Sequence, residues 1–148
     1  MWARKVSLSE LLKKGLVEKF QSDAGQIRNQ AELAKTDLAS AKKILEIGDW
    51  KWAYNAAYNA MLQAGRGLMF SRGYRPKSEE GHVAVISFVN AVYSSKIPED
   101  IRREFDRARR RRNEATYDQA GIISESQARG LFEKAETFVN TALEILRV

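Results

Sequence analysis

The stretch from Trp50 to Arg72, WKWAYNAAYNAMLQAGRGLMFSR, indicates the fold class of this chain. Alanine and aromatic residues dominate it, and its apolar positions nearly encircle a helix, as expected for the central and most buried helix of a bundle. Aromatic residues at helical spacing usually belong to a core, although they could also stack on nucleic-acid bases. The aromatic residues concerned are Trp50, Trp52, Tyr54 and Tyr58.

A helix is expected before this stretch. It begins after the capping pair Ser22-Asp23 and ends at Gly48-Asp49. Its apolar residues recur at alternating spacings of four and three, which places them on one stripe. They are Ile27, Ala31, Ala34, Leu38, Ala41 and Leu45.

Three more helices are expected after it. The polar residues 74–81 predict a loop, and a helix then takes residues 82–94. The next helix begins at Pro98, beside two acidic residues, and extends to residue 117 or 118. The last follows Ser124. Because β-branched residues are sparse and never alternate, we predict an all-α fold, an antiparallel bundle of four to five helices.

The length of 148 residues is that of one domain. We assign residues 1–21 to an N-terminal leader, a short helix or a partly ordered segment, and residues 22–148 to the bundle. The chain has no cysteine, which excludes disulfides and thiolate metal sites. We find neither a targeting segment nor an apolar run long enough to span a membrane, so we expect a cytoplasmic protein with no membrane partner.

Positive charge is concentrated in one place. The formal net charge is +6, which favours an anionic partner, and seven arginines fall between Arg102 and Arg112. Adjacent like charges repel along a helix, so something anionic should compensate them. Guanidinium groups suit phosphate well. A solvated basic surface is the alternative interpretation.

The arginine run divides into two sets on a helix. At about 100° per residue, Arg109, Arg112, Asn113 and Tyr117 share one face, whereas Arg110 and Arg111 point largely elsewhere.

His82, the only histidine, either has a structural role or, if it lies near the arginine face, joins a phosphate site. The sequence contains no Gly-rich phosphate loop and no clustered carboxylates or histidine pair at metal-binding spacing, so we predict neither a metal nor a cofactor.

Several short segments, in their order and spacing, resemble the prokaryotic HEPN domain (higher eukaryotes and prokaryotes nucleotide-binding). The similarity runs from about residue 31 to residue 146. The resemblance implies a helical bundle of the type found in substrate-binding subunits of nucleotidyltransferases, and a homodimer in which the late motif faces the partner subunit. The segments are residues 34–38, 45–50 and 56–61, then Gly73 before Lys77 and His82, and RNEATYD at residues 112–118.

The resemblance also implies two kinds of function. Many HEPN domains are metal-independent ribonucleases whose motif is an arginine, a polar residue and a later histidine. Others accompany a minimal nucleotidyltransferase in a toxin–antitoxin pair. On this pattern Arg112 and Asn113 match, but Tyr117 stands where the histidine is expected. Its ordinary pKa near 10 suits proton transfer at neutral pH poorly.

Three hypotheses follow. The first is a non-catalytic dimer that binds nucleotide or RNA phosphate through Arg109, Arg112, Asn113 and His82, as the partner of a minimal nucleotidyltransferase. The second is a ribonuclease in which Arg112 binds the scissile phosphate and Asn113, Tyr117 or His82 supplies the missing function. The third is a scaffold whose arginines are solvated or paired with acidic residues, namely Glu99, Asp100, Glu104 and Asp106.

Overall fold

The computed structural model describes residues 6–78, 81–117 and 122–148, and the backbone alone for residues 113–117. The described residues form six helices and a small two-stranded sheet, which confirms the prediction of a helical bundle. The elements are α1 (Leu8–Lys13), β1 (Val17–Lys19), α2 (Ala24–Glu46), α3 (Trp50–Ser71), β2 (Tyr74–Pro76), α4 (His82–Val92), α5 (Glu99–Tyr117) and α6 (Glu125–Leu146).

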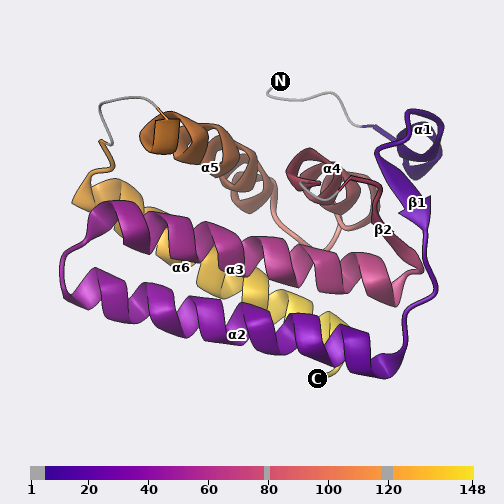
Figure 1. The fold of residues 1–148 in the computed structure, drawn as a ribbon, viewed down its shortest axis with the longest axis horizontal. Helices are drawn as coiled ribbons and strands as arrows, with labels where there is room; N and C mark the ends of the chain where they lie inside the picture. Colours follow the sequence, from indigo (N-terminus) through magenta and orange to yellow (C-terminus); the bar gives the residue numbers. More distant parts are fainter. Residues whose placement is uncertain (1–5, 79–80, 118–121) are drawn as a thin grey trace.

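Helix α3 is the centre of the bundle, as its sequence predicted. It contacts α2, α4, α5 and α6. In Figure 1, α2 and α3 lie side by side, α6 passes behind them, and α4 and α5 lie along the edge of α3 opposite α2. Tyr54 and Tyr58 are completely buried in the core, whereas Trp52 is 54% exposed. The aromatic residues of α3 are therefore not all core.

The predicted helix starts have a local physical cause. At the start of α2, the backbone N–H of Gln26 donates a hydrogen bond to the side chain of Asp23. The backbone N–H of Asp23 in turn donates to the side-chain oxygen of Gln26. Ser124 and Gln127 form the same capping box at the start of α6. Each box satisfies donors that the first helical turn leaves free, which confirms both predicted caps.

The prediction of a continuous loop at residues 74–81 is wrong at its beginning. Strand β2 pairs antiparallel with β1, with Val17 opposite Pro76. An ion pair of 3.2 Å joins Arg75 to Glu18 across the two strands. Leu11 and Val17 are buried in the same hydrophobic cluster as the bundle. A strand of three residues is too short for an alternating apolar pattern to reveal it in the sequence. The pairing also joins residues nearly sixty positions apart.

Helices α3 and α4 approach each other closely at Gly65. A Cβ atom built on Gly65 would lie 2.4 Å from Cγ1 of Val85, so only glycine fits there. His82 is the first residue of α4, one turn before Val85. This contact therefore fixes the start of α4 beside the middle of α3.

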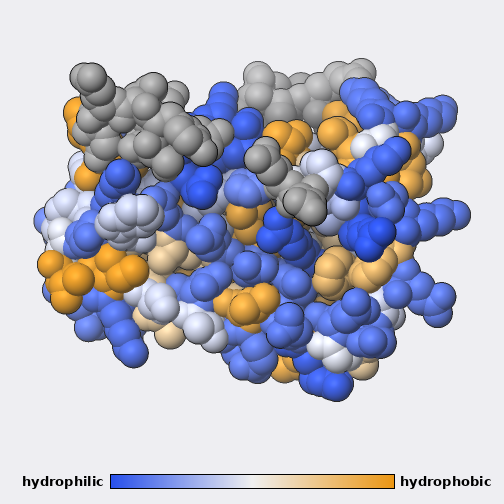
Figure 2. Space-filling view, in the orientation of Figure 1, coloured by the Kyte–Doolittle hydropathy of each residue, from blue (hydrophilic) through white to orange (hydrophobic). Residues whose placement is uncertain are grey.

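The surface is mainly polar on the face drawn in Figure 2, where the hydrophobic patches are small and separate. Among the described residues, no helix combines the length and the hydropathy needed to cross a membrane.

Candidate phosphate-binding site

Tyr58 joins three helices at one point. Its hydroxyl lies 2.9 Å from Nδ1 of His82, at hydrogen-bond distance. Its ring meets the ring of Phe105 on α5 edge to face, with centroids 5.8 Å apart. Because Tyr58 is completely buried, its hydrogen bond holds the side chain of His82 against α3, and its ring contact holds Phe105 of α5 at the same place.

Arg112 lies over the same tyrosine. Its guanidinium carbon is 5.7 Å from the centroid of the Tyr58 ring, a cation–π distance. Its Nε atom is buried and has no hydrogen-bond partner among the described residues. Arg112 also forms no ion pair with them. A buried hydrogen-bond donor without a partner destabilises the folded protein. An acceptor from outside the described residues would therefore be favourable at the Nε atom of Arg112.

Most other arginines of α5 have carboxylate partners on their own helix. These pairs lie one turn apart and explain how the helix accommodates so many like charges, at about 0.3–0.5 kcal/mol for each pair. These arginines are therefore paired with carboxylates within α5. The pairs are Arg103 with Glu99 at 2.9 Å, Arg107 with Glu104 at 3.1 Å, and Arg109 and Arg110 with Asp106 at 3.4 and 3.2 Å.

Arg111 corrects the prediction that it points away from the face of Arg112. Its Nη1 atom donates to the hydroxyl oxygen of Tyr54 at 3.2 Å and lies 3.7 Å from a carboxylate oxygen of Glu104. Tyr54 and Tyr58 are one turn apart on α3, so neighbouring arginines of α5 each reach one tyrosine. The side chain of Arg110 is 59% exposed and does point outward.

The pKa values of both tyrosines are raised, and different groups oppose the rise at each of them. Burial raises the pKa of Tyr58, and the charges of Arg112, Arg109 and Arg66 oppose that rise in pKa without cancelling it. Burial likewise raises the pKa of Tyr54, against the hydrogen bond from Arg111. Both hydroxyls are therefore neutral at neutral pH and act as hydrogen-bonding groups.

A family model described as the HEPN domain matches residues 27–146, which include almost all of α2 and everything from α3 to α6. The chain belongs to the HEPN domain family. None of the curated proteins compared with it matches significantly.

The structure describes only the backbone of two residues of the predicted motif. The backbone of Asn113 and Tyr117 belongs to α5, but their side chains are outside the described part. Of the residues predicted for the site, the structure brings Arg112 and His82 to the same tyrosine, and Arg109 lies on the same side. The sequence pattern indicated neither the hydrogen bond of Tyr58 nor the position of Arg66 beside it. The helical spacing from Tyr58 to Arg66 was the available signal.

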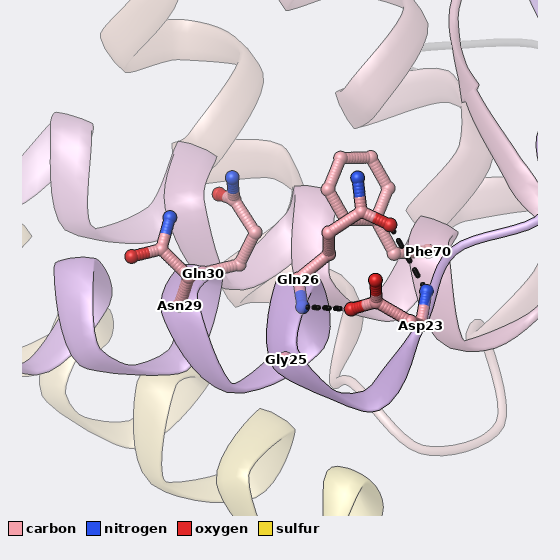
Figure 3. Close-up of a pocket in the computed structure, with 6 residues that line it drawn as sticks. All are labelled: Asp23, Gly25, Gln26, Asn29, Gln30 and Phe70. Atoms are coloured by element: carbon pink, nitrogen blue, oxygen red, sulfur yellow. Dashed lines mark hydrogen bonds between the residues drawn. The ribbon is translucent and has the colours of Figure 1, made fainter.

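A depression in the surface of this HEPN domain lies away from the Tyr58 cluster. It has a volume of about 520 Å³ and is separated from Tyr58 by about 18 Å along α3. Figure 3 shows the capping box of Asp23 and Gln26 inside it, so polar groups of the first turn of α2 already bond to each other. The lining residues are Asp23, Gly25, Gln26, Asn29, Gln30 and Phe70, none of them cationic.

Metal binding has no evident donor set in the described residues. They contain no group of three or more histidine, aspartate or glutamate side chains arranged to hold an ion.

Proposed function

We propose that this HEPN domain binds the phosphate of nucleotide or RNA through Arg112, at a cleft completed by a second copy of the chain. The observation that carries the proposal is the contrast between Arg112 and its neighbours. Arg107, Arg109, Arg110 and Arg111 each have a partner on the protein, whereas the buried Nε of Arg112 has none in the described residues. A phosphate oxygen is the acceptor that suits an unpaired guanidinium.

The surroundings of Arg112 support the same ligand. The guanidinium of Arg112 lies over the Tyr58 ring, and His82 is held within the same cluster by its hydrogen bond to that tyrosine. Arg109 adds positive charge from the preceding turn, offset in part by Asp106. Asn113 follows Arg112 on the helix, where its amide would add a neutral donor to phosphate.

Dimerisation and the partner enzyme complete the proposal, and both rest on the family resemblance. HEPN domains pair through the motif helix, which would bring two copies of Arg112 to one groove. The proposed partner is a minimal nucleotidyltransferase, with the two proteins forming a toxin–antitoxin-like pair. Tyr117, in place of the motif histidine, favours a binding role over cleavage.

A second candidate is a metal-independent ribonuclease, favoured by the position of His82. In that reaction the ribose 2′-oxygen attacks phosphorus and gives its proton to a base. The bond from phosphorus to the 5′-oxygen breaks and that oxygen takes a proton, which leaves a 2′,3′-cyclic phosphate. Arg112 would bind the phosphate and His82 would exchange protons, with Asn113 or Tyr117 as the remaining candidates for the other transfer.

Calorimetric titration tests the binding proposal. The purified full chain is titrated with ATP and with a short RNA, as wild type and as Arg112→Met. We expect heat from at least one ligand with the wild type, and a loss of affinity of about tenfold or more in the variant. No heat with either ligand would refute the proposal, as would equal affinity in the variant.

Transfer RNA separates the two candidates. Cleavage by the wild type that disappears in both Arg112→Met and His82→Gln would favour the ribonuclease. Equal cleavage by all three proteins would indicate contamination.

A further inference from the structure

Arg66 adds a further arginine to the cluster around Tyr58, from the same helix as the tyrosine. Tyr58, Leu62 and Arg66 are spaced four residues apart on α3, so they share one side of the helix. Side chains of a helix lean toward its N-terminus, which directs the long side chain of Arg66 back toward Tyr58. The mutual electrostatic effect of the two groups is consistent with this proximity, since Arg66 lowers the pKa of Tyr58.

Arg66 is held in a partly dehydrated position. Its neighbour Gly65 is the point at which α4 presses against α3 through Val85. Arg66 itself is half-buried, and this burial lowers the pKa of its guanidinium. Among the described residues it has no carboxylate partner. A guanidinium that is partly dehydrated and unpaired favours an anion beside it.

The positive charges around Tyr58 are only partly balanced. Asp106 accepts ion pairs from Arg109 and Arg110, and so offsets charge on that side. Arg66 and Arg112 have no such offset in the described part of the chain. Within the described residues, two guanidinium charges are therefore not balanced by a carboxylate.

The number of charges distinguishes two kinds of phosphate. An internal phosphodiester carries a single negative charge. A phosphate monoester carries about −1.5 to −2 at pH 7, because its second pKa is near 6, and it offers three terminal oxygens as acceptors. Two arginines from different helices can each bind a different oxygen of such a group.

We propose that Arg66 and Arg112 together bind a terminal phosphate monoester, in preference to an internal phosphodiester. The proposal rests on the proposed function, in which Arg112 binds phosphate, and adds Arg66 as a binding residue and a ligand class. The monoester could be the end of an RNA chain or a free nucleoside monophosphate. Both present the same chemical group.

Paired ligands test the preference. The full-length protein is titrated with one short RNA carrying either a 5′-phosphate or a 5′-hydroxyl, and with AMP or adenosine. The proteins are wild type, Arg66→Met, Arg66→Lys, Arg112→Met and, as a control, Arg28→Ala. Methionine keeps most of the aliphatic stem of Arg66, and Arg28 is an exposed arginine on α2.

We expect at least one phosphorylated ligand to bind the wild type about tenfold more tightly than its dephosphorylated form, as a lost charge-assisted hydrogen bond would give. In Arg66→Met that preference should fall below about twofold, with Arg66→Lys intermediate and Arg28→Ala unchanged. Preference in the RNA pair alone identifies the chain end as the source, and preference in the AMP pair identifies the free nucleotide.

Two results would overturn the inference. One is equal affinity of the wild type for both members of each pair, and the other is a preference that survives intact in Arg66→Met. If RNA binding is nevertheless lost in Arg112→Met, the proposed function stands and only the role of Arg66 fails. If the wild type binds none of the four ligands, both fail.

Discussion

Arg111 and Arg112 are neighbours of the same type, yet we predict different roles for them, because Arg111 has partners on the protein and the Nε atom of Arg112 has none in the described residues. Arg111→Met removes the Nη1 donor that lies 3.2 Å from the Tyr54 hydroxyl oxygen. Tyr54 is completely buried, so its hydroxyl group loses this hydrogen bond inside the protein. The side chain of Arg111 is only 27% exposed, so solvent replaces the lost bond incompletely. We expect the free energy of unfolding to fall by about 1–2 kcal/mol. The melting temperature should fall by about 2–8 °C.

Arg112→Met should behave differently. The substitution loses a cation–π contact with Tyr58, a loss of about 0.5–1 kcal/mol. It also removes a buried Nε atom that lacks a partner in the described residues, which offsets the loss. The net change in the free energy of unfolding should stay within about 0.5 kcal/mol. Phosphate affinity, in contrast, should fall strongly in this variant and little in Arg111→Met.

Urea denaturation followed by circular dichroism measures the first quantity, and titration with RNA measures the second. Both variants are compared with the wild type in one buffer at pH 7. If Arg112→Met lowers the free energy of unfolding as much as Arg111→Met does, Arg112 serves the fold and the reasoning from its missing partner is refuted. Full stability in Arg111→Met would refute the role given to the Tyr54 contact.

Three further predictions concern the surroundings of the site and the stability of the bundle. Tyr58→Phe keeps the ring beneath Arg112 but removes the hydrogen bond to His82, so thermal melts should show a loss of about 1 kcal/mol; an unchanged melt would count against that bond. Gly65→Ala forces α4 away from α3 and should destabilise by about 1–3 kcal/mol. The control Gly130→Ala on α6, where a Cβ meets nothing within 4 Å, should stabilise by up to about 1 kcal/mol in the same denaturation experiment. Burial raises the pKa of Asp37 above 3.8, which penalises its charged form in the folded state, so Asp37→Asn should be the more stable protein at pH 7. That difference should vanish below pH 3.8, where the carboxyl is protonated in both states, and its persistence at pH 3 would contradict the cause.

The helices could be predicted because their signals are local. The capping boxes at Asp23 and Ser124 and the encircling apolar positions of α3 each lie within a few residues of the structure they specify. The two-stranded sheet could not be predicted, since Val17 and Pro76 are far apart in the sequence and nothing local to either residue specifies the other as its partner.

The candidate site could be predicted in part. The charge run pointed to the helix that became α5, and the motif pointed to Arg112, whose role in binding phosphate stays a prediction. The direction of Arg111 was wrong because an angle of 100° per residue ignores the reach of a long side chain toward Tyr54. The hydrogen bond between Tyr58 and His82 joins two helices, and no pattern along the chain encodes their contact. The roles of Asn113 and Tyr117 remain predictions.

The salt dependence of RNA affinity tests the central claim most directly. Each phosphate contact that releases a counterion from single-stranded RNA adds about 0.7 to the slope of log affinity against log salt concentration. Measured from about 50 to 200 mM salt, the slope for Arg112→Met should be shallower than that of the wild type by about that amount for each copy of the site engaged. Identical slopes and affinities for the two proteins would show that Arg112 does not contact phosphate, and would contradict the account.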